Sequence, residues 1–386
     1  MLQPGSLSRL SQASGLGAGG RPCVPPGRRN AAANVGATTP RPPLFRRARA
    51  LSGALAVVAA GGLVVALRAA APTIEFHTFT GEAMATDWQI VVPDRPGAEA
   101  VAAECLALFR ALDLELSEWK EGSPLSAVNR AAGVAPVAVP AELLALVERS
   151  LELGAATGGA FDPSWAALWG VWDFRAAVPR VPEPEAIAAR LPLVDYRRIA
   201  IDRGARTLFL PTAGMKLGLG AIGKGYALDR AAALLDARGF GDFLLVGGGQ
   251  VLARGEPGGG RPWRIGLRDP RGAPDELFAR VAVADASLST SADNESFFEL
   301  DGVRYHHILD PKTGRPARGL RSATVLHREA TVADALSTAV MVLGRERGLE
   351  IAARLGAEAL VVDERGEVSA TPGMAHLVER LAPPRI

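Results

Sequence analysis

The segment that decides how this chain folds and what chemistry it can carry is His306–Gly344, HHILDPKTGRPARGLRSATVLHREATVADALSTAVMVLG. A histidine stands beside an Asp-Pro turn, and Asp334 and Thr338 follow later in a stretch with helical apolar spacing. Residues four apart lie on one helix face, so this spacing stacks a carboxylate and a hydroxyl. Because Mg²⁺ prefers hard oxygen ligands, the segment predicts a magnesium site beside a proton acceptor. That pairing favours transfer of a phosphorus-linked group.

The composition sets limits on the class of protein. With 386 residues, of which 48% are apolar, the chain could hold one large domain or two smaller ones around an ample core. The formal net charge of +2 gives no indication of nucleic-acid binding. Only two cysteines occur, so no disulfide framework is expected. Cys105 lies in an apolar helical stretch and is expected to be a core residue.

The first 71 residues differ from the rest. Residues 1–50 are rich in Gly, Pro, Ser, Ala and Arg without periodicity, which predicts a disordered leader or a misplaced start. Residues 51–71 contain the apolar run LSGALAVVAAGGLVVAL, with arginines before it and small residues after it. This pattern predicts a signal peptide or an N-terminal membrane anchor, and a buried core helix is the alternative.

Residues 74–384 are expected to form one α+β unit, because strands and helices mix without strict βαβ alternation and no internal repeat or linker is evident. A hairpin is predicted at 297–309, since Asp301-Gly302 suits a type I′ turn. Neighbours on a strand point to opposite faces, so only one of His306 and His307 can face a given site. Helices are predicted at 98–116 and 140–157, and further strands at 206–210, 243–246, 263–267, 278–283 and 323–326.

The glycine-rich stretch GLGAIGKGYALDRAAALL, residues 218–235, fits two nucleotide-binding patterns incompletely. The G-x-G-x-x-G pattern lacks its βαβ unit and following acidic residue, and the G-x-x-x-x-G-K pattern has Gly225 where Ser or Thr must bind Mg²⁺. What remains is a glycine-rich turn into a helix ending near Arg238 and closed by Gly239. Such a turn presents N–H groups and Lys224 to an anion, although a purely structural turn is the alternative.

Two segments that contain tryptophan do not indicate a function when each is considered by itself. GGAFDPSWAALWGVWDF (158–174) could cover a planar ligand by stacking or simply fill a core. SEWKEGSPLSAVNRAAG (117–133) reads as a polar loop between helices, with Trp119 as a distinctive member. By contrast, Asp334 stands in an otherwise apolar helical segment and therefore needs a partner, for which a metal is the natural candidate.

Taken in order, eight blocks resemble the FAD:protein FMN transferase family, known as ApbE. Collinear matches run from about residue 80 to about residue 345. The blocks are MATDW (84–88), SEWKEGSPLSAVN, GGAFDPSWAALW, AIGKGYALDRAA, LVGGGQVLARG, LSTSADNE (288–295), HHILDPKTG and ADALSTAVMVLG.

The resemblance implies an ApbE-like flavin transferase fold of mixed sheets with flanking helices. Family members take FAD as substrate, transfer its FMN half to a threonine hydroxyl of an acceptor protein and release AMP. By resemblance, His307 accepts the threonine proton, and Mg²⁺ is bound by the Ala221 carbonyl, Asp334 and Thr338, with Ser337 close by. The positions that would hold FAD are Met84, Trp119, Ala160, Phe161, Asp162, Lys224 and Leu309.

The acceptor is expected to be a membrane or periplasmic electron-transfer protein, with this chain exported or anchored on the periplasmic side of the bacterial inner membrane. The chain departs from the family at several points: Gly218 and Gln250 stand where Asp is common, and His306 replaces a small or polar residue. No lipid-attachment cysteine follows the apolar run. Two alternatives keep the site: a pyrophosphatase that yields FMN and AMP, and a flavin-binding protein without turnover.

Overall fold

The computed structural model describes residues 74–385. The predictions for residues 1–50 and 51–71 lie outside this range. Within it, no helix has the length and apolar character needed to cross a membrane.

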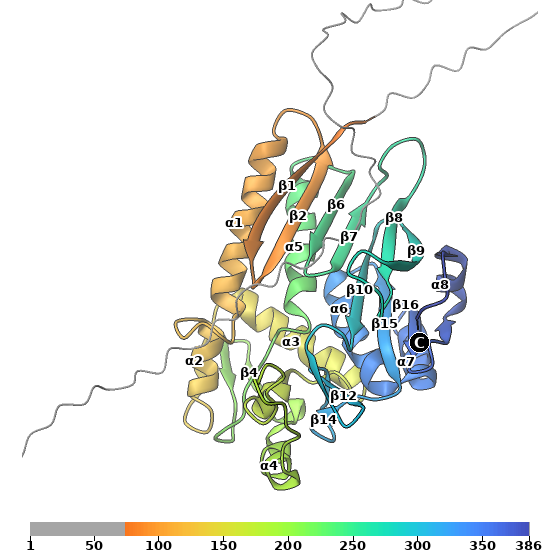
Figure 1. Ribbon diagram of the computed structural model, residues 1–386. Helices are drawn as coiled ribbons and strands as arrows, with labels where there is room; N and C mark the ends of the chain where they lie inside the picture. Colours follow the sequence, from red (N-terminus) through yellow and green to blue (C-terminus); the bar gives the residue numbers. More distant parts are fainter. Residues whose placement is uncertain (1–73, 386) are drawn as a thin grey trace, which may run out of the picture.

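The frame of the molecule is an eight-stranded sheet with the order β1-β2-β6-β7-β10-β15-β16-β17 (Figure 1). Each pair of neighbours in this sheet is antiparallel. β6 is an apolar run that is buried throughout, as expected for a strand covered on both faces. β15 is also buried along most of its length, although it carries polar residues such as Ser322 and Thr324. The strands are β1 Phe76–Ala83, β2 Thr86–Pro93, β6 Phe243–Gly247, β7 Gln250–Arg254, β10 Ala286–Ala292, β15 Leu320–His327, β16 Glu358–Asp363 and β17 Val368–Ala370.

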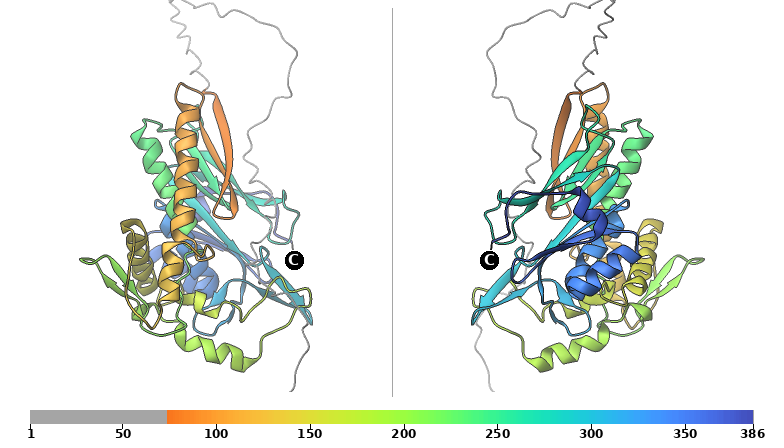
Figure 2. Two further views of the ribbon diagram at one scale, coloured as in Figure 1. Left: turned by 90° about the vertical axis from the view of Figure 1, so that its left-hand side faces the viewer. Right: turned by 90° about the vertical axis from the view of Figure 1, so that its right-hand side faces the viewer.

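Helices cover one face of this sheet and a second, smaller sheet covers part of the other (Figures 1 and 2). The helical layer holds the larger core, and the layer between the sheets holds a second core that includes Trp263, Phe278 and Met374. The helices are α1 Ala98–Leu116, α3 Ala141–Ala156, α5 Gly223–Ala237, α6 Ala330–Leu343 and α7 Arg345–Arg354; the second layer is β8 Trp263–Arg268, β9 Leu277–Val283, α8 Pro372–Leu377 and β18 Val378–Arg380.

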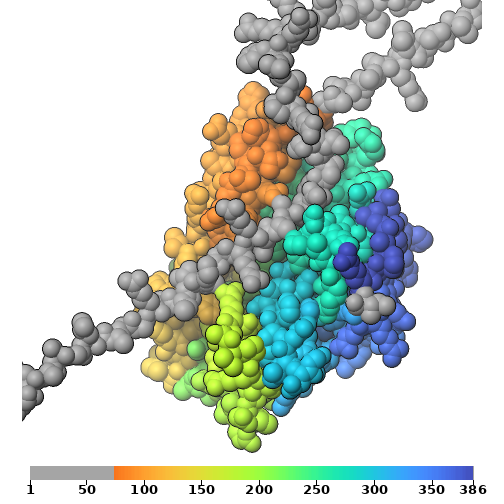
Figure 3. Space-filling model, viewed as in Figure 1, coloured from red at the N-terminus to blue at the C-terminus, as the bar shows by residue number. Residues whose placement is uncertain are grey.

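A third, small apolar cluster lies at one end of the molecule, between residues 168–194 and the hairpin β11–β12. Figure 3 shows these two segments side by side on the surface. The short elements are α2 Pro124–Arg130, β3 Val137–Ala138, η1 Pro163–Leu168, α4 Pro184–Arg190, η2 Leu191–Leu193, η3 Tyr196–Arg198, β4 Ala200–Asp202, β5 Thr207–Phe209, β11 Phe297–Leu300, β12 Val303–His306, β13 Leu309–Asp310 and β14 Arg315–Pro316.

The α+β class is confirmed, as are the predicted helices and strands to within a few residues. Asp301 and Gly302 both have positive φ, of 51° and 73°, as the predicted type I′ turn requires. Cys105 is a fully buried core residue, and burial raises the pKa of its thiol to about 12.

The sheets with flanking helices are as expected, and the pairings of the main sheet are antiparallel. Two other expectations are wrong. The loop at 117–133 contains α2, which begins at Pro124 after Ser123, whose side chain caps it. The second hairpin strand ends at His306 rather than Leu309, because the Ile308 N–H bonds to the His306 ring and the Ile308 carbonyl accepts from Ala317.

Candidate active site

The site is built where the start of α5 meets α6. Gly225 lets the two helices approach: a Cβ at that position would lie 2.2 Å from the Ala330 carbonyl oxygen. Its backbone N–H donates to the Asp334 carboxylate at 3.0 Å. Asp334 is buried, and the Lys224 ammonium lies 3.9 Å from its other oxygen. Asp334 thus has the partners that its apolar sequence context demanded.

The turn before α5 leaves a carbonyl free. Gly225 lies in the first turn of α5, whose N-cap is Ile222, so its N–H has no acceptor within the helix, and the Asp334 carboxylate supplies one. Ala221 precedes the helix, and among residues 74–385 no backbone N–H donates to its carbonyl. Asp334 is therefore joined to the first turn of α5, and the carbonyl of Ala221, just before that turn, is available to another ligand.

Thr338 and Ser337 connect α6 to β10. The hydroxyl of Ser291 on β10 lies 2.8 Å from that of Ser337 and 3.3 Å from that of Thr338. Ser337 donates back to the Asp334 carbonyl at 2.8 Å. The i,i+4 spacing does stack Asp334 and Thr338 on α6, with Ser337 turned toward the sheet. Ser291 belongs to a quoted block, but sequence reasoning gave it no role; its signal was a run of small polar residues in a buried strand.

These oxygens fit a hard cation. Within residues 74–385, no group of three or more His, Cys, Asp or Glu side chains could hold a metal ion. The arrangement above has a different donor set, with one carboxylate, one hydroxyl and one free backbone carbonyl. Such oxygen ligands suit Mg²⁺, which is usually held by one or two carboxylates together with substrate phosphates and water.

The two histidines have different environments. His306 is buried, its Nε2–H donates to the Ala317 carbonyl at 2.8 Å, and its Nδ1 lies 3.3 Å from the Ile308 N–H. His307 is exposed, and its Nδ1 lies 3.3 Å from the carbonyl oxygen of Ser296, which can only accept. Nδ1 therefore carries the proton, and Nε2 of His307 is free to accept one.

The electrostatic surroundings keep His307 neutral. Part of His307 is exposed, but the protein atoms packed around the ring reduce its hydration, which disfavours the charged form. Together with the charge of the neighbouring His306, this loss of hydration lowers the pKa of His307 to about 4. The positive charges of Lys224 and Arg175 add to the lowering of this pKa. An imidazole with this pKa is neutral at pH 7 and can act as a base.

Trp119 presents an aromatic surface. Its side chain is 69% exposed and stacks on Trp169, with ring centroids 4.2 Å apart and an interplanar angle of 19°. Trp165 meets Trp169 edge-on, whereas Trp172 belongs to the small apolar cluster. The ring-rich turn is thus divided between an exposed platform and a core. Gly218 permits this packing, since a Cβ there would lie 2.9 Å from that of Ala166.

The other predicted FAD residues are mostly buried. The side chains of Ala160, Phe161 and Leu309 are core residues, and the carboxylate of Asp162 accepts from Ser164 and from the Tyr196 N–H. Contact with a ligand would therefore have to come from their backbone groups. Met84 is placed otherwise: it lies in the β1–β2 turn with a positive φ of 53°, and its methyl group is 3.4 Å from a Cβ built at Gly223.

Glu118 is a site residue that sequence reasoning missed. Burial, opposed in part by hydrogen bonds from the Leu219–Gly220 backbone and by the charge of Lys224, raises the pKa of Glu118 to about 7. Its only sequence signal was its place beside Trp119. An ionisable carboxyl thus lies against the glycine-rich turn.

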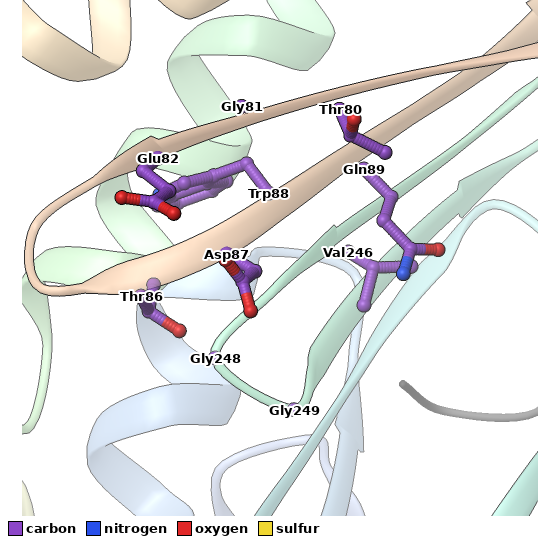
Figure 4. Close-up of a pocket in the computed structure, with 10 residues that line it drawn as sticks. All are labelled: Thr80, Gly81, Glu82, Thr86, Asp87, Trp88, Gln89, Val246, Gly248 and Gly249. Atoms are coloured by element: carbon purple, nitrogen blue, oxygen red, sulfur yellow. The ribbon is translucent and has the colours of Figure 1, made fainter. Parts of the chain in front are cut away.

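A separate hollow of about 320 Å³ lies beside this site, between the β1–β2 hairpin and the β6–β7 turn (Figure 4). Glu82 and Asp87, which are opposite each other in the strand register, both line it. None of the predicted site residues lines this hollow.

Comparison with known proteins decides the family. Residues 84–361 match the profile of the ApbE family, which covers most of the described residues. The chain belongs to the ApbE family. The FAD:protein FMN transferase of Treponema pallidum is 38% identical over 311 residues, covering 75% of this chain and 85% of that protein. The FAD:protein FMN transferase of Escherichia coli K12 is 30% identical, covering 76% of this chain and 86% of that protein.

Solved structures agree. The ApbE protein of Thermotoga maritima superimposes with a TM-score of 0.73 at 32% identity, covering 78% of this chain and 99% of its own. The flavin transferase ApbE of Vibrio cholerae gives a TM-score of 0.71 at 28% identity, covering 79% and 99% respectively. The described residues therefore have the ApbE fold.

Proposed function

We propose that this chain is an enzyme that transfers FMN from FAD to a threonine hydroxyl of an acceptor protein, with Mg²⁺ as cofactor and AMP as the second product. Its curated relatives are named as FAD:protein FMN transferases, which supports flavin transfer. The single observation that carries the metal-dependent chemistry is the hydrogen bond from Gly225 to Asp334, which joins the carboxylate to the first turn of α5, just after Ala221 with its free carbonyl.

Asp334, Thr338 and the Ala221 carbonyl would hold Mg²⁺, with Ser337 supporting Thr338 through Ser291. Bound there, the ion would neutralise charge on the diphosphate of FAD as a P–O bond breaks. Lys224 supplies a positive charge at the same place, because its ammonium lies next to Asp334 and donates to the Gly220 carbonyl. Lys224 would bind a phosphate oxygen of FAD.

His307 would act as the general base. As the threonine oxygen attacks the FMN phosphorus, Nε2 of His307 takes the hydroxyl proton, a new P–O bond forms, and the bond to the AMP oxygen breaks. Nδ1–H remains bonded to Ser296, which fixes the tautomer that this step needs. Trp119 would stack on a ring of FAD, with its other face supported by Trp169.

We further propose that the acceptor is a membrane or periplasmic electron-transfer protein and that the chain works on the periplasmic side of the inner membrane. The support is the apolar run after basic residues in the amino-terminal sequence.

The test is incubation with FAD, Mg²⁺ and a threonine-bearing acceptor protein of an ApbE relative, followed by mass measurement of the acceptor and assay of AMP. An acceptor heavier by FMN, with AMP in equal amount, is expected. AMP release at the same rate without an acceptor would indicate a pyrophosphatase instead. Unchanged FAD in the presence of Mg²⁺ would indicate a flavin-binding protein.

A further inference from the structure

The first turn of α6 is capped by another helix. Its own N-cap residue, Glu329, makes no capping hydrogen bond with its side chain. Instead, the Asp229 carboxylate on α5 accepts from the N–H groups of Ala330 and Thr331, both at 2.8 Å, and from the Thr331 hydroxyl at 2.6 Å. The first N–H groups of a helix lack partners within it, and the helix dipole favours an acidic group there.

The hydrogen bonds of Asp229 go to α6. Burial raises the pKa of this carboxyl, the hydrogen bonds from Thr331 and Ala330 oppose that rise, and the remaining effect is repulsion from Glu329. The hydrogen bonds that the described residues make to the Asp229 carboxylate come from Ala330 and Thr331. A partly buried carboxylate depends on such donors, which makes the α5–α6 contact specific in position.

Asp229 works together with Gly225, one turn earlier on the same face of α5. Gly225 lies against the Ala330 carbonyl and donates to Asp334, so α5 holds α6 at two successive points. From the sheet side, Gln250 donates to the same Ala330 carbonyl at 2.8 Å. The start of α6 is therefore fixed against both α5 and β7, one turn before Asp334.

We propose that Asp229 is a positioning residue for the metal site: by holding the first turn of α6, it sets where Asp334 lies relative to the Ala221 carbonyl. This rests on the proposed function, in which Mg²⁺ binds between them. Asp334 belongs to α6 and Ala221 to the turn that begins α5, so a slip between the helices separates the two ligands. Loss of a partner that orients a metal ligand commonly weakens metal binding about 10- to 100-fold.

The experiment measures metal binding directly, without turnover. Mn²⁺ binding to the apo protein is followed by electron paramagnetic resonance and Mg²⁺ binding by calorimetry. The proteins are wild type, Asp229→Asn and Thr331→Ala, with Asp236→Asn as the matched control because Asp236 is an exposed acid on the same helix. We expect Asp229→Asn to raise the dissociation constant about tenfold, Thr331→Ala to raise it less, and the control to leave it unchanged.

Flavin fluorescence without metal supplies the second readout, and FAD affinity there should be the same in all four proteins. A folded Asp229→Asn protein with wild-type metal affinity would overturn the inference about Asp229 and leave the proposed function unaffected. Should that variant not fold, Thr331→Ala decides, and wild-type affinity in it overturns the inference. If the wild-type protein binds neither Mn²⁺ nor Mg²⁺, the metal assignment in the proposed function falls with it.

Discussion

The Asp334 carboxylate accepts a hydrogen bond from the Gly225 backbone N–H at 3.0 Å, across 109 residues of sequence. Gly225 lies in the first turn of α5, where its N–H has no acceptor within the helix, so one contact both orients the acid and satisfies that N–H. Asp334 therefore has a structural role as a hydrogen-bond acceptor, and this role does not require its negative charge.

Substitution of Asp334 should separate these tasks. Asp334→Asn keeps an acceptor for the Gly225 N–H but removes the charge that Mg²⁺ needs, so the protein should fold normally and lose Mg²⁺-dependent transfer. Asp334→Ala leaves a buried N–H without a partner and should also lose about 1–3 kcal/mol of stability. Thermal unfolding and Mg²⁺ titration of activity check both. Equal stability of the two variants would show that the Gly225 bond contributes little.

The two histidines should behave differently. His307→Ala removes the proposed base, so transfer should fall about 10²- to 10⁴-fold while FAD binding is retained. His306→Ala removes buried hydrogen bonds to the Ala317 and Ile308 backbone and should lower stability while leaving activity in the folded fraction. His77→Ala, at an exposed position on β1, is the control. An inactive His306→Ala beside an active His307→Ala would reverse the assignment.

Sequence spacing alone predicted that Asp334 and Thr338 share a face, because helical periodicity is local. It also predicted that only one of the paired histidines could face a site. It could not choose between them, since the choice depends on Ser296 and Ala317, which contact those rings only in the folded chain.

The same limit applies to glycine. In the sequence, Gly225 was notable only because it stands where the G-x-x-x-x-G-K pattern requires Ser or Thr. In the structure, its lack of a side chain allows close approach to Ala330, more than a hundred residues away. Likewise, no role for Asp229 was evident in the sequence, although this residue caps the distant helix α6. Contacts between helices far apart in sequence leave no periodic signal, so these positions became interpretable only with the fold.

The pH dependence of turnover should reflect His307. Its pKa is lowered to about 4, and a base works in its deprotonated form, so activity at saturating FAD should stay level from pH 8 to 6. It should then fall as the pH approaches the pKa and the ring takes a proton. A rate measurement across this range checks the prediction. If the rate is half-maximal at a pH close to the ordinary pKa of histidine, the His307 ring is not desolvated in the substrate-bound enzyme as described.

Binding of FAD should carry a separate pH dependence from Glu118. Its pKa is raised to about 7, so the carboxyl ionises as the pH rises through neutrality. The negative charge then attracts Lys224 and repels the diphosphate, and FAD affinity should fall between pH 6 and pH 8. Glu118→Gln cannot ionise and should flatten the curve. Flavin fluorescence titrations measure both, and parallel curves for the two proteins would exclude Glu118 as the cause.

The exposed ring of Trp119, which stacks on Trp169, is expected to contribute to FAD affinity. A tryptophan that is 69% exposed contributes little to the core, so Trp119→Ala should leave stability unchanged. Stacking of an aromatic side chain on a base is worth about 1–3 kcal/mol, so FAD affinity should fall by roughly 5- to 150-fold. Trp119→Phe should recover part of that loss because it keeps a π-face.

Trp169→Leu tests whether the second ring matters. The substitution keeps the outer face of the Trp119 ring but removes the Trp169 ring that packs against its inner face and orients it. FAD affinity should therefore fall less than in Trp119→Ala. Leu114→Ala, at a similarly exposed apolar position on α1, is the control for surface truncation. Because stacking acts on binding and not on the base, the rate at saturating FAD should be unchanged. A loss of rate with normal affinity would mean that Trp119 contacts the acceptor rather than the flavin nucleotide.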